Sequence, residues 1–172
     1  MNARDVSFAG LFAALTAVGA QITVPIGPVP FTLQVLLVLL SGLVLGSRLG
    51  LLSQLVYLVA GAVGFPVFAG FSGGFAHIYG PTGGYLLAFP IAAFLAGYLT
   101  EKSGDNVWGM ALGSLLGVAA IYLVGWLRLG LFLAGDFEKA FALGVLLFVP
   151  FDVLKAAVAV GIGKSVRKMV EV

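Results

Sequence analysis

Residues 49–100 have the sequence LGLLSQLVYLVAGAVGFPVFAGFSGGFAHIYGPTGGYLLAFPIAAFLAGYLT and contain no Asp, Glu, Lys or Arg. About 20 apolar residues cross a bilayer as a helix, so this run is too long for one span and has to turn within itself. Its middle, residues 64–85, is rich in glycine, phenylalanine and tyrosine. We therefore expect two membrane helices joined by a glycine-rich and aromatic loop.

The composition of the whole chain agrees with a bilayer environment. The chain is 61% hydrophobic and 9% charged, with a mean hydropathy of +1.15. An ordinary soluble domain has roughly 25% charged residues. The sequence thus predicts an integral membrane protein whose charges lie mainly at the ends of its helices.

Cutting the uncharged runs at proline, glycine and isolated charges gives six spans. A cluster of prolines at Pro25, Pro28 and Pro30 ends the first span. The predicted spans cover about 6–23, 31–45, 49–63, 85–99, 107–127 and 141–163. We expect one all-α bundle over residues 1–172, with the loop at about 64–85 on one face.

The distribution of Lys and Arg predicts the orientation, because cytoplasmic loops of membrane proteins are enriched in these residues. Six spans place both termini on the same side. That side receives Arg4, Arg48, Lys102, Lys164, Arg167 and Lys168, and the other side receives Arg128 and Lys139. We expect both termini in the cytoplasm and the loop at 64–85 facing outward.

The composition of this loop suits a lid over a small molecule. Glycine lets the backbone turn sharply and approach a ligand closely, whereas Phe and Tyr offer broad apolar faces. A loop that only connected two helices in water would be more polar. We expect the loop to cover a small, partly apolar ligand.

Asp152 and Lys155 interrupt the otherwise uncharged stretch 140–163 and share one helical face. A charge near mid-bilayer costs about 2.5–3.5 kcal/mol on insertion scales, so such residues normally face the interior of a bundle and mark a site. Pro150 should disturb this helix and leave backbone carbonyls near Leu146 free for other partners. The pair could be a structural ion pair, a proton relay, or two contacts to one ligand.

Several other chemistries are excluded or disfavoured by the sequence. The chain has no cysteine and a single histidine, His77, so we expect no catalytic residue, no metal site and no resident cofactor. Residues 163–165, Gly-Lys-Ser, match only the second half of a phosphate-binding loop, because Val158 stands where the first glycine belongs. We expect no nucleic-acid partner, and any ATP hydrolysis must come from another polypeptide.

Three stretches carry a family resemblance: PIGPVPFTLQ (25–34), the loop GFPVFAGFSGGFAHIYGPTGGYLLAF (64–89) and PFDVLK (150–155). They resemble the biotin-binding S component, the BioY family, of energy-coupling-factor vitamin transporters. The resemblance implies a six-helix subunit of a prokaryotic cytoplasmic (inner) membrane that captures biotin from the outer side. In that family, a transmembrane coupling subunit and a pair of cytoplasmic ATPases supply the energy.

The resemblance also implies site residues. The family's acidic and basic pair in the last helix matches Asp152 and Lys155, which are the main candidates. The further candidate contacts are Tyr85, Gly73, Gly74, Gly83, Gly84, Phe68, Tyr79 and Gln34. Thr32 could assist Gln34. Some family members have an Asn in the loop, and in this chain Tyr79 or His77 could replace it.

The first span carries Ala13 and Ala17, four residues apart. In the family an AxxxA pattern in this helix forms part of the surface that docks on the coupling subunit, so the resemblance assigns both residues to that contact. Similar ladders at Gly42, Gly46 and Gly50 suit internal helix packing.

Alternative functions stay open at the level of the sequence. An autonomous proton-coupled carrier would use Asp152 as its proton relay, and a scaffold subunit would use the buried pair only for folding. Within the resemblance itself, another vitamin could replace biotin.

Overall fold

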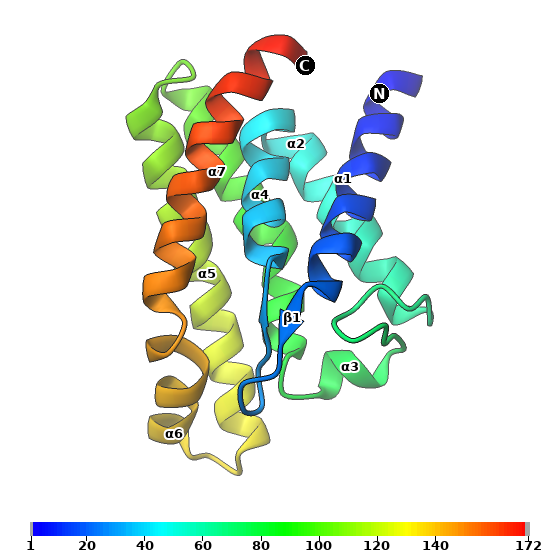
Figure 1. Ribbon diagram of the computed structural model, residues 1–172, viewed down its shortest axis with the longest axis vertical. Coiled ribbons are helices and arrows are strands. Elements are labelled where there is room, and N and C mark those ends of the chain that lie inside the picture. The colour runs from blue at the N-terminus through cyan, green and yellow to red at the C-terminus, as the bar shows by residue number, and fades with distance from the viewer. Residues whose placement is uncertain (1, 171–172) are drawn as a thin grey trace.

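The computed structural model describes residues 2–170 and is a bundle of long helices (Figure 1). Five helical runs in this part of the chain are long and apolar enough to cross a membrane, and the two chain ends lie at the same end of the bundle. These runs are α1 (Ala3–Gln21), α2 (Gln34–Ala62), α4 (Gly83–Lys102), α5 (Val107–Phe132) and the run Phe137–Val170. The expected all-helical membrane fold is confirmed.

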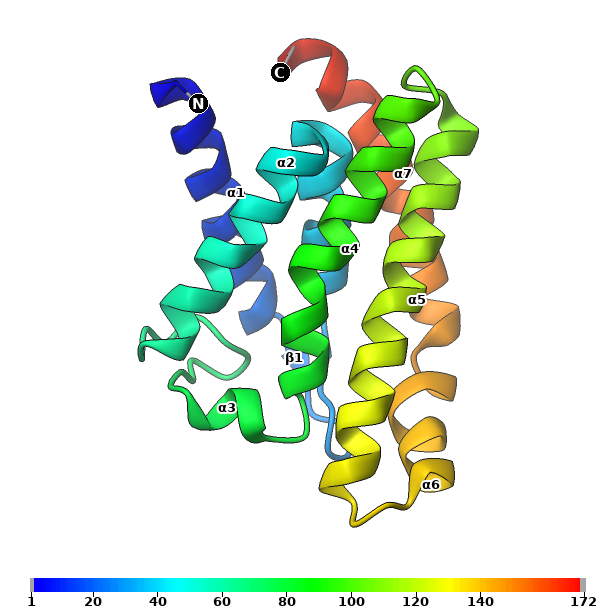
Figure 2. The ribbon, with the colours of Figure 1, turned by 180° about the vertical axis from the view of Figure 1, so that it is seen from behind.

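Most of the second and third predicted spans lies in α2, which begins at Gln34 instead of Phe31 and folds back on itself at Gly46. This residue has φ 85° and ψ 178°, a conformation open to glycine and strained for other residues. The two arms, 34–45 and 47–62, approach so closely that a Cβ atom on Gly50 would lie 2.7 Å from the Cα atom of Gly42. Figure 2 shows the second arm descending from this turn. The chain therefore passes through the bundle six times, as expected.

Glu101, at the end of α4, holds this turn in place. Its Oε1 atom accepts a hydrogen bond from Ser47 N at 2.8 Å, and its Oε2 atom accepts one from Ser47 Oγ at 2.7 Å. The carboxylate thus lies at the amino-terminal end of the second arm, where the helix dipole favours negative charge. Gly97 packs on the backbone of Gly46 and Ser47, which fixes α4 against the turn.

The glycine ladders serve internal packing, as predicted. A Cβ atom on Gly42 would collide with the backbone of Ala93 in α4, and one on Gly113 would lie 2.9 Å from the carbonyl oxygen of Ala96. Small residues let helices approach at backbone distance. α4 consequently lies between α2 and α5 as the central helix of the bundle.

Short elements close the opposite end of the bundle from the termini. The strands β1 (Thr23–Val24) and β2 (Phe31–Thr32) pair antiparallel, with Thr23 opposite Thr32, and this hairpin contains the proline cluster. The loop 63–82 contains the short helix α3 (Ala76–Tyr79). Figures 1 and 2 show the hairpin and this loop side by side at the lower end of the molecule.

The last span is interrupted near its amino-terminal end. It consists of α6 (Phe137–Phe141), a π-helical turn η1 (Ala142–Leu146) and α7 (Val149–Val170), so it extends beyond the predicted range 141–163 at both ends. Pro150 lacks an N–H group, which removes one bond of the helical ladder. The disturbance predicted near Leu146 is present, and Gly144 O accepts a hydrogen bond from the Tyr85 hydroxyl at 2.8 Å.

Candidate ligand-binding site

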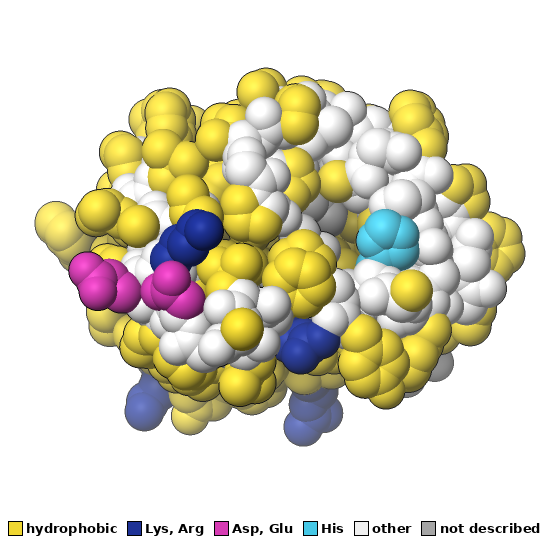
Figure 3. Space-filling view, turned by 90° about the horizontal axis from the view of Figure 1, so that it is seen from below, with side chains coloured by type: hydrophobic (Ala, Val, Ile, Leu, Met, Phe, Trp, Pro, Cys, Tyr) yellow, Lys and Arg dark blue, Asp and Glu magenta, His cyan; other side chains and the backbone are white. Residues whose placement is uncertain are grey.

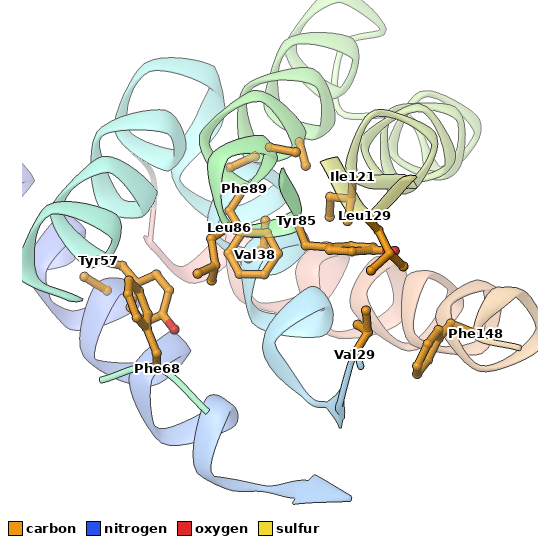
Figure 4. Packing of buried hydrophobic residues seen from close by; sticks show 14 of the residues in the cluster. Val29, Val38, Tyr57, Phe68, Tyr85, Leu86, Phe89, Ile121, Leu129 and Phe148 are labelled. Atoms are coloured by element: carbon orange, nitrogen blue, oxygen red, sulfur yellow. The ribbon is translucent and has the colours of Figure 1, made fainter. Parts of the chain in front are cut away.

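A cavity of about 440 Å³ lies between the helices and the loop 63–82. This volume is within the usual range of small-molecule sites, roughly 300–1,000 Å³. Its walls come from the hairpin, the first arm of α2, the loop, α4, α5 and the interrupted last span. Figure 4 shows buried hydrophobic side chains near it, with Tyr57 against Phe68 and Tyr85 against Leu129. The cavity is therefore mainly apolar, with few polar groups.

Asp152 and Lys155 line one wall of this cavity. Lys155 Nζ donates to Asp152 Oδ1 at 2.7 Å, and the two residues are only 7% and 4% exposed, respectively. Asp152 lies in the first turn of α7, where the partial positive charge of the helix terminus stabilises a carboxylate. The sequence predicted this pair as facing the interior, and the structure confirms that position.

Two further groups surround the ion pair. The Tyr122 hydroxyl donates to Asp152 Oδ2 at 2.6 Å, so both carboxylate oxygens have a protein donor. Lys155 Nζ lies 4.1 Å from the centre of the Phe31 ring, which is within the range of a cation–π interaction. An ammonium group has three N–H donors, and one of them bonds Asp152. The pair has no net charge and retains both donor and acceptor capacity toward the cavity.

A second polar group lines the cavity at the start of α2. Gln34 Nε2 donates to the Tyr57 hydroxyl at 2.6 Å, and Gln34 Oε1 accepts from Thr32 Oγ1 at 2.9 Å. The Tyr57 hydroxyl in turn donates to Val67 O in the loop at 3.0 Å. Thr32 and Gln34, both candidate contacts from the sequence, line the cavity. Their chain of bonds connects the hairpin, α2 and the loop.

Phe68 is the loop side chain that closes the cavity. It is 2% exposed and packs edge-on against Tyr57 and His77. A Cβ atom on Gly61 would occupy the space of the Phe68 ring, so this glycine makes room for it. Phe65 and Phe71 point away and are 62% and 72% exposed. The loop thus contributes one buried aromatic side chain.

His77 and Tyr79, the two alternatives for a polar loop contact, differ in position. His77 lines the cavity, whereas the Tyr79 side chain is 63% exposed and lies outside it. Arg128 donates from Nη2 to the Tyr79 carbonyl, which ties this part of the loop to α5. Figure 3 shows this face: the histidine side chain lies on one side and most of the charged side chains gather on the other.

The four glycines predicted as contacts, Gly73, Gly74, Gly83 and Gly84, do not line the cavity and instead shape its walls. Gly73 packs against the carbonyl of Phe65, and Gly74 has φ 107° and donates its N–H to Gly61 O at 2.7 Å. Gly83 lies against the backbone of Ile78, and Gly84 lies against α5. The structure thus brings Asp152, Lys155, Tyr85, Phe68 and Gln34 together in one cavity and leaves Tyr79 and these four glycines outside it.

Ala13 and Ala17, predicted to dock on a partner, differ in exposure. Ala13 is 7% exposed because it packs inside this chain's own bundle, so its side chain is not available to a partner. Ala17 is partly buried beside it. The small residues that α1 exposes are Ala3, Ser7, Gly10 and Ala14. A partner that docked on α1 would therefore contact the exposed side of this helix.

Tyr122 and Tyr57 were missed by the sequence analysis. Each is a single tyrosine inside an apolar span, and nothing in the local pattern distinguishes it from a packing residue. A hydroxyl group in a membrane helix needs a hydrogen-bond partner, and this need was the one signal that could have pointed to the two tyrosines.

Among residues 2–170 the structure places no group of three or more His, Asp or Glu side chains that could hold a metal ion.

Comparisons with known proteins identify the class of protein that this fold and cavity define. The BioY family profile matches residues 1–172. A protein of Pyrococcus horikoshii described as a probable biotin transporter BioY is 56% identical over 97% of this chain and 98% of its own length. A biotin transporter BioY of Thermotoga maritima is 45% identical over 96% of this chain and 97% of its own length.

A comparison with a solved structure agrees with these sequence relatives and extends the similarity to the fold. The crystal structure of an S-component for biotin from an ECF-type ABC transporter superposes with a TM-score of 0.90. It is 29% identical, and the match covers 98% of this chain and 95% of that chain. This chain belongs to the BioY family.

Proposed function

We propose that this protein binds biotin in the cavity between α7 and the loop 63–82 and serves as the substrate-capturing subunit of a biotin importer. The observation that carries the proposal is the buried Asp152–Lys155 pair facing a mainly apolar cavity. The names of the relatives support biotin as the ligand. The relatives are described as transporters, which supports transport as the role.

The chemistry of the pair favours the ureido group of biotin. This neutral group has two N–H donors and one carbonyl acceptor, which suit the Asp152 carboxylate and the Lys155 ammonium, respectively. A carboxylate placed at Lys155 would also face the negative charge of Asp152, which lies 2.7 Å from Nζ. Like charges repel strongly in a site that excludes water. The valerate carboxylate therefore points away from this pair.

The apolar body of biotin suits the rest of the cavity. Phe68, Tyr85, Leu86 and Phe89 all line it, and each of them is at least nine-tenths buried. Aromatic and aliphatic faces of this kind bury a fused ring and its thioether without a polar cost. Thr32 and Gln34 form the second polar group of the cavity, and this group would bind a polar atom at another part of the ligand.

We further propose that transport is coupled to ATP hydrolysis by partner proteins. The solved structure of similar fold comes from an ECF-type ABC transporter, which supports a coupling membrane subunit and a pair of cytoplasmic ATPases as partners. Residues 163–165 lie within α7, so they do not form a phosphate-binding loop between a strand and a helix. With the termini in the cytoplasm, the loop 63–82 would receive biotin from outside.

The geometry gives less support to an autonomous proton carrier. Both oxygens of Asp152 already accept hydrogen bonds, from Lys155 and Tyr122. A proton relay has to exchange its proton with a neighbouring carrier, whereas the two groups bonded to Asp152 belong to the wall of the cavity itself and tie both oxygens to it. Uptake of biotin into ATPase-free vesicles that an uncoupler abolishes would favour the carrier instead.

The direct test is calorimetry on the purified protein in detergent. We expect biotin to bind one-to-one, with thiamine and riboflavin giving no heat. Binding of one of these vitamins instead of biotin would support the cavity as a ligand site and show that the substrate is a different vitamin. A stable protein that binds none of the three vitamins would contradict the proposed function.

A further inference from the structure

The last residue of α1, Gln21, contacts the loop with its side chain. Its Nε2 atom donates to Phe68 O at 3.1 Å, and its Oε1 atom accepts from Phe71 N at 2.7 Å. The same Nε2 atom also donates to Ala17 O at 3.1 Å, within α1. One amide therefore bonds two backbone groups of the loop while it stays anchored to its own helix. Figures 1 and 2 both show the lower end of α1 beside this loop.

The two loop groups belong to one tight turn, residues 68–72. Phe68 N donates to Ser72 O at 2.9 Å, and Ser72 N donates to Phe68 O at 3.3 Å. Inside the turn, Gly70 has φ 73° and Phe71 has φ 56°. A positive φ is unfavourable for phenylalanine, and such a conformation persists only where the surroundings hold it. The bond from Phe71 N to Gln21 is one such restraint.

This turn forms part of the wall of the proposed ligand site. Phe68, Ala69 and Ser72 all line the cavity. Phe68 is nearly fully buried, so it cannot leave the cavity wall without moving the turn. On either side of this turn the loop is bound to α2, through Phe65 N to Ala60 O at 3.1 Å and Gly74 N to Gly61 O at 2.7 Å. The centre of the loop is bound to α1 through Gln21.

We propose that Gln21 is a positioning residue that holds the turn 68–72 closed over the ligand and so sets how long the ligand stays bound. Gln21 does not line the cavity and acts through Phe68. Opening the turn breaks both of its loop bonds, so a ligand leaving past Phe68 has to wait for this event. The inference rests on the proposed function only for the identity of the ligand, biotin.

The test compares biotin dissociation rates in three variants of the purified protein. Gln21→Met keeps the size of the side chain and loses both bonds to the loop. Gln21→Asn keeps the amide and is one methylene too short to reach both loop atoms. We expect each to increase the dissociation rate by about tenfold, because affinity changes at one site fall mainly on that rate. Asn106→Ala, which removes the N-cap of α5 at the far end of the molecule, is the stability control and should leave the rate unchanged.

Hydrogen–deuterium exchange of the ligand-free protein gives a second readout. Both Gln21 variants should accelerate exchange in residues 65–75 and leave residues 34–45 unchanged, and Asn106→Ala should do neither. An unchanged dissociation rate and unchanged exchange in both variants would overturn the proposal. The proposal would also be overturned if Gln21→Met increased the dissociation rate and Gln21→Asn did not. A polar side chain too short to bond both loop atoms would then be sufficient. If the unmodified protein binds no biotin, the proposed function fails, and the exchange data still test Gln21.

Discussion

The two sides of the cavity are built differently. On the helical side, the buried carboxylate of Asp152 accepts bonds from the buried Lys155 of α7 and from the partly buried Tyr122 of α5. On the loop side, one aromatic ring closes the cavity, and the chain is held by backbone bonds and by Gln21 and Tyr57. Buried side-chain networks on packed helices are hard to rearrange, whereas a loop held by a few bonds opens at low cost. The helical side is thus suited to selecting the ligand and the loop to admitting it.

Breaking the ion pair should have the largest effect. Lys155→Ala or Asp152→Asn should weaken biotin binding by about a hundredfold or more, because each leaves a buried polar partner unsatisfied. Binding by calorimetry and thermal unfolding should be measured together. Lys164→Ala, on the exposed side of the same helix, is the matched control. Unchanged affinity in both variants would show that Asp152 and Lys155 do not contact biotin.

Tyr122→Phe should have the next largest effect, about a tenfold loss of affinity. The change removes one hydrogen bond to the Asp152 carboxylate and keeps the ring, and bonds to charged groups contribute about 1.5–3 kcal/mol. Tyr98→Phe, a half-exposed tyrosine of α4, is the control. An affinity equal to that of the unmodified protein would mean that Asp152 is positioned by Lys155 and the helix alone.

Two variants of the loop test the other side of the cavity, and their expected effects on biotin affinity are smaller. Phe68→Leu should weaken biotin binding by about three- to tenfold, because a smaller apolar side chain still closes the cavity but packs less well. Phe65→Leu should leave binding unchanged, since that ring points to the surroundings. Equal effects of the two variants in a titration would contradict the assignment of Phe68 as the closing residue.

A change on the exposed side of α1 should have the smallest effect on binding. Ala14→Trp should leave biotin affinity unchanged and reduce copurification with a coupling subunit, if the partner docks on this side. Ala13→Trp is the contrasting variant, because its side chain points into the bundle and overpacking there costs about 1–3 kcal/mol of stability. Normal copurification of the Ala14 variant would place the docking surface elsewhere.

Sequence reasoning succeeded where the signal lies in composition and charge. Asp152 and Lys155 stand out because charges are costly in a membrane span, and their i, i+3 spacing alone places them on one helical face. It failed at positions where the chemistry depends on a distant neighbour. Tyr79 and His77 are two residues apart in one aromatic loop, yet only His77 faces the cavity. Ala13 and Ala14 are adjacent, yet one is buried and the other exposed.

The sequence by itself determined the membrane class, the six passes, the polar pair and the glycine-rich loop, because these follow from local hydropathy and from glycine and proline chemistry. Only the tertiary structure decided which side chains meet. It brought Gln21 to Phe68, Tyr122 to Asp152 and Glu101 to Ser47, all far apart along the chain. Such pairings depend on how helices pack and on where Gly46 turns the chain, and no local pattern records that geometry.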